Sequence, residues 1–110
     1  FNDEVKIARY IKDNTINTDR IYSHRMQGLI YLEAERLANS KFFFIPSLED
    51  ETPIIDEFKS NFERKKPKYI VFDERYDYNQ DTDIYIKEYI SKNYKKEYGI
   101  KTITLYKLIE

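Results

Sequence analysis

The chain has 110 residues, of which 41% are hydrophobic and 35% are charged, and this composition is typical of one soluble globular domain. Nineteen basic and twenty acidic residues leave a net charge of −1, so charge gives no reason to expect binding to nucleic acid or to an anionic membrane. The absence of cysteine excludes disulfides, thiolate metal sites and a cysteine nucleophile, and two glycines are too few for a glycine-rich phosphate loop.

The first predicted elements are a helix and a short strand. Asn2 can cap a helix whose first turn carries two acidic residues, which favour the positive end of the helix dipole. Apolar residues at helical spacing give this helix one buried face: Val5, Ala8 and Ile11, with Ile7 alongside. The polar segment 14–19 ends the helix, and residues 20–24 then predict a strand.

Two more helices, with a strand between them, are predicted in the middle of the chain. Residues 27–38 are amphipathic, with Ile30, Ala34, Leu37 and Ala38 on one face. Residues 41–46 predict a second strand that ends at its proline. Thr52 followed by Pro53 is typical of a helix start, and the helix is expected to end at residues 65–67. The predicted buried face of this helix consists of Ile54, Ile55, Phe58 and Phe62.

The most informative segment is the apolar run 69–72, which follows a proline and precedes two acids. A short continuous apolar run is typical of a strand buried on both faces, as in parallel sheets covered by helices. Its acidic end would lie at the carboxyl edge of the sheet, where open α/β folds bind their ligands.

A fourth helix and a hairpin complete the predicted elements. Asp81, Thr82 or Asp83 can cap a helix that carries Ile86, Tyr89 and Ile90, followed by Tyr94. Residues 94–98 and 101–108 flank Gly99, and the second of these segments is rich in β-branched residues. We therefore predict a hairpin centred on Gly99.

The alternation of strands and helices predicts an α/β fold. We expect a three-layer, Rossmann-like domain with three parallel strands, a C-terminal antiparallel hairpin and helices on both faces. The expected strand order is 2-1-3-5-4, because strand four carries charges suited to a sheet edge. We expect one domain over residues 1–110. Since the chain opens on Phe1 and runs almost at once into a helix, we expect it to be a fragment of a longer protein.

Polar side chains are predicted to meet where strands one and three end. They could line a ligand crevice, in which carboxylates and guanidinium groups would suit sugar hydroxyls. The predicted ligand-binding residues are Ser23, His24, Arg25, Gln27, Asp73, Glu74 and Arg75. The alternative is that these are solvated loop residues, with Asp73 holding a nearby loop or helix start.

Three further interpretations stay open. His24 and Asp73 could act as a base and its orienting acid in a small enzyme, although no serine lies in a nucleophile elbow. The acids between residues 73 and 83 could bind Ca²⁺, but they lack the glycine of an EF-hand loop, and helix capping explains them. The basic stretch 64–68 could contact lipid headgroups or stabilise a helix end. We predict no catalytic residue, no metal and no cofactor.

Four short motifs, in their order along the chain, resemble a known family. The matching segments are Tyr10–Thr15, Asp19–Tyr22, Lys66–Asp73 and Gly99–Lys107. In that family they look like Y-I-K-E-N-T, D-K-I-Y, K-P-K-Y-I-V-x-D and G-x-x-L-Y-K. The chain thus resembles the soluble C-terminal domain that follows the membrane spans of bacterial glycosyltransferases similar to dolichyl-phosphate-mannose–protein mannosyltransferases.

This resemblance implies a non-catalytic domain of a multi-pass membrane protein, on the extracytoplasmic face of the bacterial cell membrane. The parent enzyme would transfer a sugar from a lipid-linked donor, using acids in loops between membrane helices that have no counterpart in this sequence. The implied partners are the membrane portion of its own chain and a glycan or lipid-linked sugar, which the domain would position. The alternative function is a free-standing α/β module that binds a ligand or a protein without enzymatic activity.

Overall fold

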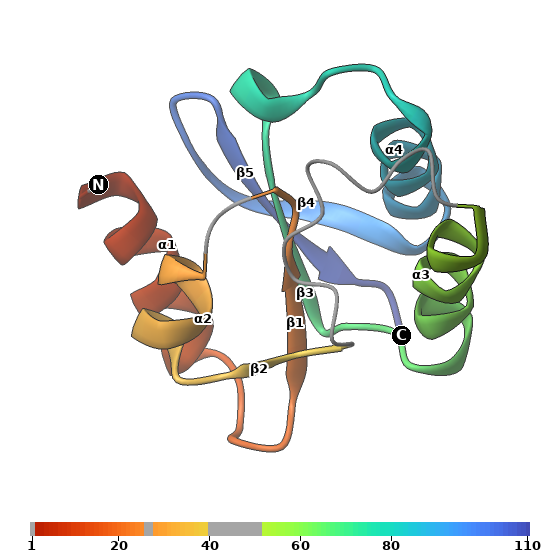
Figure 1. The fold of residues 1–110 in the computed structure, drawn as a ribbon. Helices are drawn as coiled ribbons and strands as arrows, with labels where there is room; N and C mark the ends of the chain where they lie inside the picture. Colours follow the sequence, from red (N-terminus) through yellow and green to blue (C-terminus); the bar gives the residue numbers. More distant parts are fainter. Residues whose placement is uncertain (1, 26–27, 40–51) are drawn as a thin grey trace.

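The described part of the chain forms a mixed α/β sheet of five strands with helices on both sides (Figure 1). The computed structural model describes residues 2–25, 28–39 and 52–110, and the side chains of residues 52–55 lie outside this description. The described elements are α1 (Asn2–Asp13), β1 (Arg20–Ser23), α2 (Leu29–Ala34), β2 (Leu37–Ala38), α3 (Thr52–Arg64), β3 (Tyr69–Asp73), the 3₁₀ turn η1 (Glu74–Tyr76), α4 (Asp81–Asn93), β4 (Tyr94–Ile100) and β5 (Ile103–Leu108).

The sheet has the predicted order β2-β1-β3-β5-β4. β1 runs parallel to β2 and to β3, whereas β5 runs antiparallel to β3 and to β4. β3 lies in the middle, and all of its residues are buried, as its continuous apolar run predicts. Ser23 of β1 is opposite Val71 of β3, which fixes the register at the carboxyl ends of these two strands.

Two apolar cores lie on the two faces of the sheet. On one face α1 and α2 cover side chains of the sheet, among them Ile21, Tyr69 and Val71. On the other face Phe58 and Phe62 of α3 pack with α4 against Tyr22, Ile70 and Phe72. Figure 1 shows α1 and α2 on one side of the strands and α3 and α4 on the other. Alternate residues of β3 therefore face different helices, as the twofold repeat of a strand requires.

The predicted hairpin is confirmed, but its turn is not at Gly99. Gly99 lies within β4 opposite Thr104, and the two strands are joined by Lys101 and Thr102. Lys101 takes the left-handed conformation, with φ of 54°, which tight hairpin turns require. The chain thus turns two residues later than its only nearby glycine suggests.

The helix predicted over residues 27–38 is too long. α2 ends where Glu35 adopts the left-handed conformation, with φ of 57°, and its N–H bonds to the carbonyl of Leu32. Two residues later Leu37 and Ala38 pair with β1 as the border strand β2. Leu37 is 64% exposed and is not on a buried face. The strand predicted at residues 41–46 lies outside the described residues.

The N-cap of α4 lies one to three residues before the predicted candidates. Gln80 is its N-cap, rather than Asp81, Thr82 or Asp83.

Among the described helices, none has both the length and the apolar character that crossing a lipid bilayer demands.

Candidate functional site

Asp83 is a buried carboxylate that joins the end of β1 to the start of α4. Its Oδ1 accepts hydrogen bonds from His24 Nε2 at 2.6 Å and from Arg25 Nε at 2.7 Å. Its Oδ2 accepts from the backbone N–H groups of Tyr78 and Gln80, both at 3.1 Å. The Asp83 side chain is fully buried, and so are nearly all atoms of its two basic partners. We call Asp83, His24 and Arg25 the clasp.

The contacts of His24 fit a neutral imidazole. Its Nδ1 lies 2.8 Å from the hydroxyl of Tyr22, and its ring stacks on Phe72 with centroids 5.4 Å apart. A neutral ring with its proton on Nε2 donates to Asp83 and accepts from Tyr22, so both nitrogens are satisfied. Burial lowers the pKa of His24, and the hydrogen bond to Asp83 opposes this shift only in part.

The pKa of Asp83 moves down for a different reason. Burial by itself would raise the pKa of this carboxyl, but the hydrogen bonds from His24 and Arg25 outweigh burial and hold the pKa well below its ordinary value. The carboxylate thus stays ionised inside the protein, compensated by the Arg25 guanidinium.

Asp73, at the end of β3, has its own partners. It accepts from the backbone N–H of Arg75 at 3.0 Å, from Arg75 Nη2 at 2.6 Å and from the hydroxyl of Thr102 at 2.7 Å. Burial would raise the pKa of Asp73, but these hydrogen bonds lower it overall. Asp73 therefore holds the start of η1 against the β4–β5 turn, which is the alternative that the sequence left open.

The structure does not pair His24 with Asp73, which the sequence left open as a base and its orienting acid. The two residues lie at the same end of the sheet, because Ser23 is opposite Val71. They lie on opposite faces, however, since His24 stacks on Phe72 whereas Asp73 follows the alternation of Tyr69 and Val71. His24 is instead hydrogen-bonded to Asp83.

The structure separates the remaining predicted ligand-binding residues. Ser23 is buried, its N–H donates to the Tyr31 hydroxyl at 2.8 Å, and its own hydroxyl has no partner in the described part of the chain. Glu74 and Arg75 are exposed, and Gln27 lies outside the described residues. The ligand-binding role of these residues stays a prediction.

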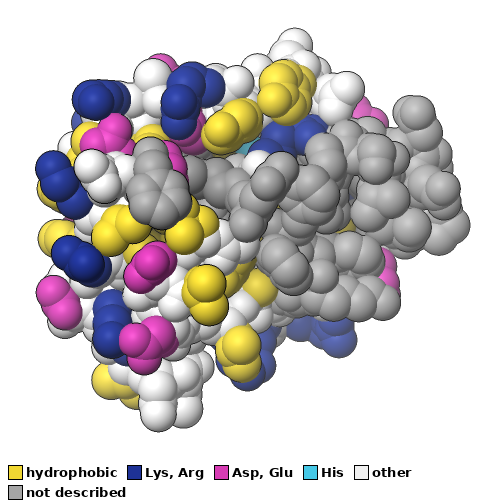
Figure 2. Space-filling model, turned by 60° about the vertical axis from the view of Figure 1, so that its left-hand side comes forward, with side chains coloured by type: hydrophobic (Ala, Val, Ile, Leu, Met, Phe, Trp, Pro, Cys, Tyr) yellow, Lys and Arg dark blue, Asp and Glu magenta, His cyan; other side chains and the backbone are white. Residues whose placement is uncertain are grey.

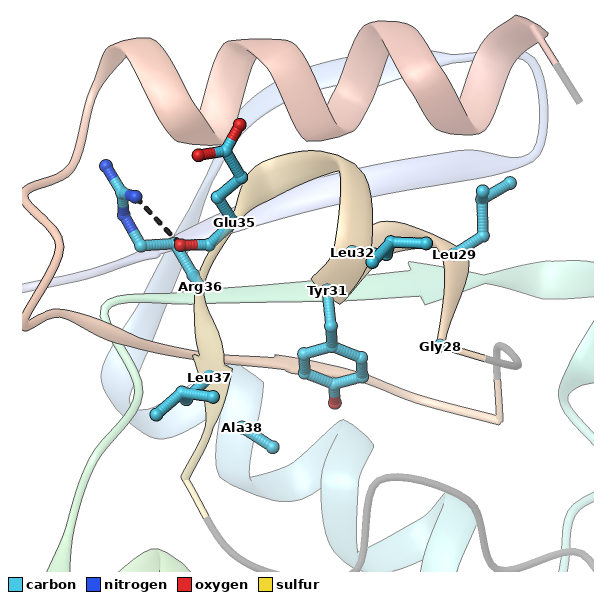
Figure 3. A pocket seen from close by; sticks show the side chains of 8 residues that line it. All are labelled: Gly28, Leu29, Tyr31, Leu32, Glu35, Arg36, Leu37 and Ala38. Carbon is cyan, nitrogen blue, oxygen red and sulfur yellow. Dashed lines mark hydrogen bonds between the residues drawn. The ribbon is translucent and has the colours of Figure 1, made fainter.

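A pocket of about 790 Å³ lies elsewhere, between α2 and β2 (Figure 3). We call it the edge pocket. Leu32 and Leu37, which line it, are 75% and 64% exposed. Its lining residues are Gly28, Leu29, Tyr31, Leu32, Glu35, Arg36, Leu37 and Ala38. Figure 2, turned toward the α1 and α2 side, shows hydrophobic side chains at the surface among charged ones.

The charged residues of the edge pocket are bound to α1 and the turn after it. Lys12 Nζ lies 2.5 Å from Glu35 Oε2, and Arg36 donates to the hydroxyl of Thr15 at 2.9 Å and to the carbonyl of Thr15 at 2.9 Å. The exposed remainder of the lining is mainly leucine. Sequence reasoning missed this pocket because it placed Leu37 and Ala38 on a buried helix face.

The acids between residues 73 and 83 are used in ion pairs and helix starts. Asp73 contacts Arg75, Asp77 lies 2.8 Å from Lys87 Nζ, and Asp83 belongs to the clasp. Across residues 2–25, 28–39 and 52–110, no three His, Asp or Glu side chains are grouped as metal ligands.

Comparison with known proteins gives one family. The model of the family described as "Putative competence-induced protein Ccs4 C-terminal domain" matches residues 2–109. No curated protein and no solved structure matches the chain. The family match corrects the resemblance to bacterial membrane glycosyltransferases, so the assignments as a glycosyltransferase and a membrane protein are withdrawn. The motifs behind them include core and turn positions of this fold, such as Tyr69 and Val71, which a small α/β domain needs for packing.

Protonation of His24 should make the protein less stable in mild acid. Its pKa is below 6.5 in the folded state, so the unfolded chain binds a proton first as the pH falls through 6.5, and the free energy of unfolding decreases. Lowering the pH through 3.8 adds a second loss, because Asp83 has a depressed pKa. Urea unfolding from about pH 8 to about pH 2 measures both steps.

The matched control is His24→Gln, whose amide can still donate to Asp83. This variant should lose the pH dependence between about pH 7 and pH 5, because the chain contains one histidine. A natural chain that grows more stable over this range as the pH falls would contradict a neutral, buried His24.

Proposed function

The chain belongs to the Ccs4 C-terminal domain family, and we propose that it is a binding module that takes an apolar group of a protein partner in the edge pocket. The observation that carries this proposal is the exposure of Leu32 and Leu37 around one hollow of about 790 Å³. Ligand pockets in proteins are commonly of this size, at roughly 300–1,000 Å³, and are lined mainly by apolar side chains. Covering the two leucines would remove apolar area from water, which favours association.

The distribution of charge supports the same choice. The carboxylates at the carboxyl end of the sheet have internal partners: Asp83 contacts Arg25, and Asp73 contacts Arg75. Glu35 and Arg36 are likewise bound to residues of α1 and its following turn. An apolar group can therefore bind in the edge pocket without dehydrating a charged side chain that lacks a partner.

We also infer that the fold is of the three-layer, Rossmann-like class. This inference is supported by the parallel pairing of β1 with β2 and β3, and by the two pairs of helices on opposite sides of the sheet in Figure 1. In such folds ligands bind beyond the carboxyl ends of the strands.

A second candidate function follows from that class: binding of a polar, hydroxyl-bearing ligand at the strand ends. The observation in its favour is the buried Ser23 hydroxyl, which has no partner among the described residues, with the exposed Arg75 guanidinium at the same end of the sheet. NMR titration with methyl α-glucoside should then shift the amide signals of Ser23 and Arg75. Shifts confined to other parts of the chain would reject this candidate.

The edge pocket is tested by charging its lining. Leu32→Asp and Leu37→Asp each place a carboxylate in the pocket. Each should weaken binding of N-acetyl-leucinamide and N-acetyl-phenylalaninamide at least fivefold, because the bound probe would remove water from the carboxylate without replacing its hydrogen bonds. Both side chains are exposed, so the fold should persist. Chemical shifts of backbone amides report binding and folding together.

The matched control is Ile109→Asp, which alters an apolar side chain that is 58% exposed on the C-terminal segment. It should leave binding of both probes unchanged. Probe-induced shifts centred away from α2 and β2, or equal loss of binding in the control, would contradict the edge pocket as the binding site.

A further inference from the structure

We infer that the partner in the edge pocket is an extended peptide segment, which adds a strand along the border of β2 that no other described strand occupies. This inference rests on the proposed function and names the chemistry of its partner. Strand addition supplies affinity through backbone hydrogen bonds, and the neighbouring pocket selects a side chain of the peptide.

The border at β2 presents backbone groups to a partner. β2 is the last strand in the described sheet, with β1 on its inner side. The N–H of Asn39 donates to the carbonyl of Ile21 in β1 at 3.2 Å, so the backbone at Asn39 faces inward. Because the direction alternates along a strand, the N–H and C=O of Ala38 face outward. Ala38 also lines the edge pocket, which joins the free backbone to the apolar hollow.

Asn39 supplies the second observation. Its side chain is nearly buried, with 7% exposed, and both atoms of its amide are without a hydrogen-bond partner in the described part of the chain. Buried polar groups are nearly always hydrogen-bonded in folded proteins, so such an amide marks a place where a partner is missing. An asparagine amide offers one acceptor and two donors, which are the groups that pair with a peptide backbone.

The opposite border of the sheet is protected, and this contrast favours β2. β4 carries Lys95 and Lys96, both exposed, and its register shifts between Lys96 and Tyr98. Lysines and bulges are devices that keep a sheet edge from pairing with other strands. β2 consists of Leu37 and Ala38, carries no charge and has the exposed Leu37 beside the edge pocket. Among the described residues, the sheet thus has one border that is protected against strand addition and one that is not.

The experiment selects peptides and then tests how they bind. A phage-displayed library of random dodecapeptides is selected on the natural chain, with Leu37→Asp used for counter-selection. The best synthetic peptide is then methylated at one backbone nitrogen at a time. β2 offers one outward carbonyl, that of Ala38. Strand addition therefore predicts that methylation of the one peptide nitrogen that donates to this carbonyl weakens binding at least tenfold, while methylation of the nitrogens on either side of it has little effect. These neighbouring positions serve as the control within the same peptide.

A variant of the chain tests the amide. Asn39→Leu keeps the size of the side chain and removes its hydrogen-bonding groups, so it should weaken the peptide at least fivefold. Its thermal unfolding midpoint should stay the same or rise, because an unpaired buried amide has been removed. A peptide that binds Asn39→Leu as tightly as the natural chain would overturn the role of Asn39. The methylation series needs no variant and decides the binding mode if Asn39→Leu does not fold.

The outcomes separate this inference from the proposed function. Peptides that need Leu37 but tolerate methylation at every position would overturn strand addition and leave the edge pocket in place. If no enriched peptide distinguishes the natural chain from Leu37→Asp, both the inference and the proposed function fail. Self-association of the chain that Leu37→Asp abolishes would also overturn the inference, because the occupant would then be a second copy.

Discussion

The ionised carboxylate of Asp83 is the constraint on which the rest of the structure depends. A buried charge is tolerated only with close compensation, and here one guanidinium, one imidazole and two backbone N–H groups surround it. These partners come from the end of β1 and from the loop before α4, so a single side chain fixes how the central sheet meets that helix. It also decides the chemistry of His24, which is held neutral between Asp83 and Tyr22. The clasp is a structural device made from residues that, in sequence, look like a reactive cluster.

Most charged groups at the strand ends are bound to one another, so we place the proposed binding surface at the border of the sheet that the described residues leave exposed. On the α1 face Asp73 and Thr102 close the gap between β3 and the β4–β5 turn, and on the α4 face the clasp closes the gap after β1. The apolar side chains of α2 and β2 have no such cover in the described part of the chain. The proposed function follows from this division: internal charge pairs stabilise the scaffold, and an exposed apolar border is left for a partner.

Sequence predicted the fold wherever a pattern was local and continuous. The run Tyr69–Phe72 placed β3 in the middle of the sheet, and the charges of β4 placed it at a border. Two features could not be predicted from any short segment of the sequence. The end of α2 depends on a left-handed Glu35, which carries no glycine signal, and the partnership of His24 with Asp83 spans 59 residues. His24 and Asp73 lie on opposite faces of the sheet because of the β1–β3 register and because successive side chains of a strand point to opposite faces. All residues of β3 are buried and most are apolar, so its sequence does not show which residue faces which side. The resemblance to membrane glycosyltransferases was wrong because its motifs include core residues, which many small α/β domains need for packing.

The most direct test of this account is the free energy of unfolding of Asp83→Asn, measured by urea denaturation at neutral pH beside Asp81→Asn. Asp83 is fully buried whereas Asp81 is exposed on the same first turn of α4, so the pair isolates the clasp from any general effect on the helix start. Removing one partner of a buried ion pair costs about 3–5 kcal/mol, and we expect a loss of this size for Asp83→Asn. The loss for Asp81→Asn should be below about 1 kcal/mol. Equal, small losses in both variants would contradict the claim that the Asp83 carboxylate holds the structure together.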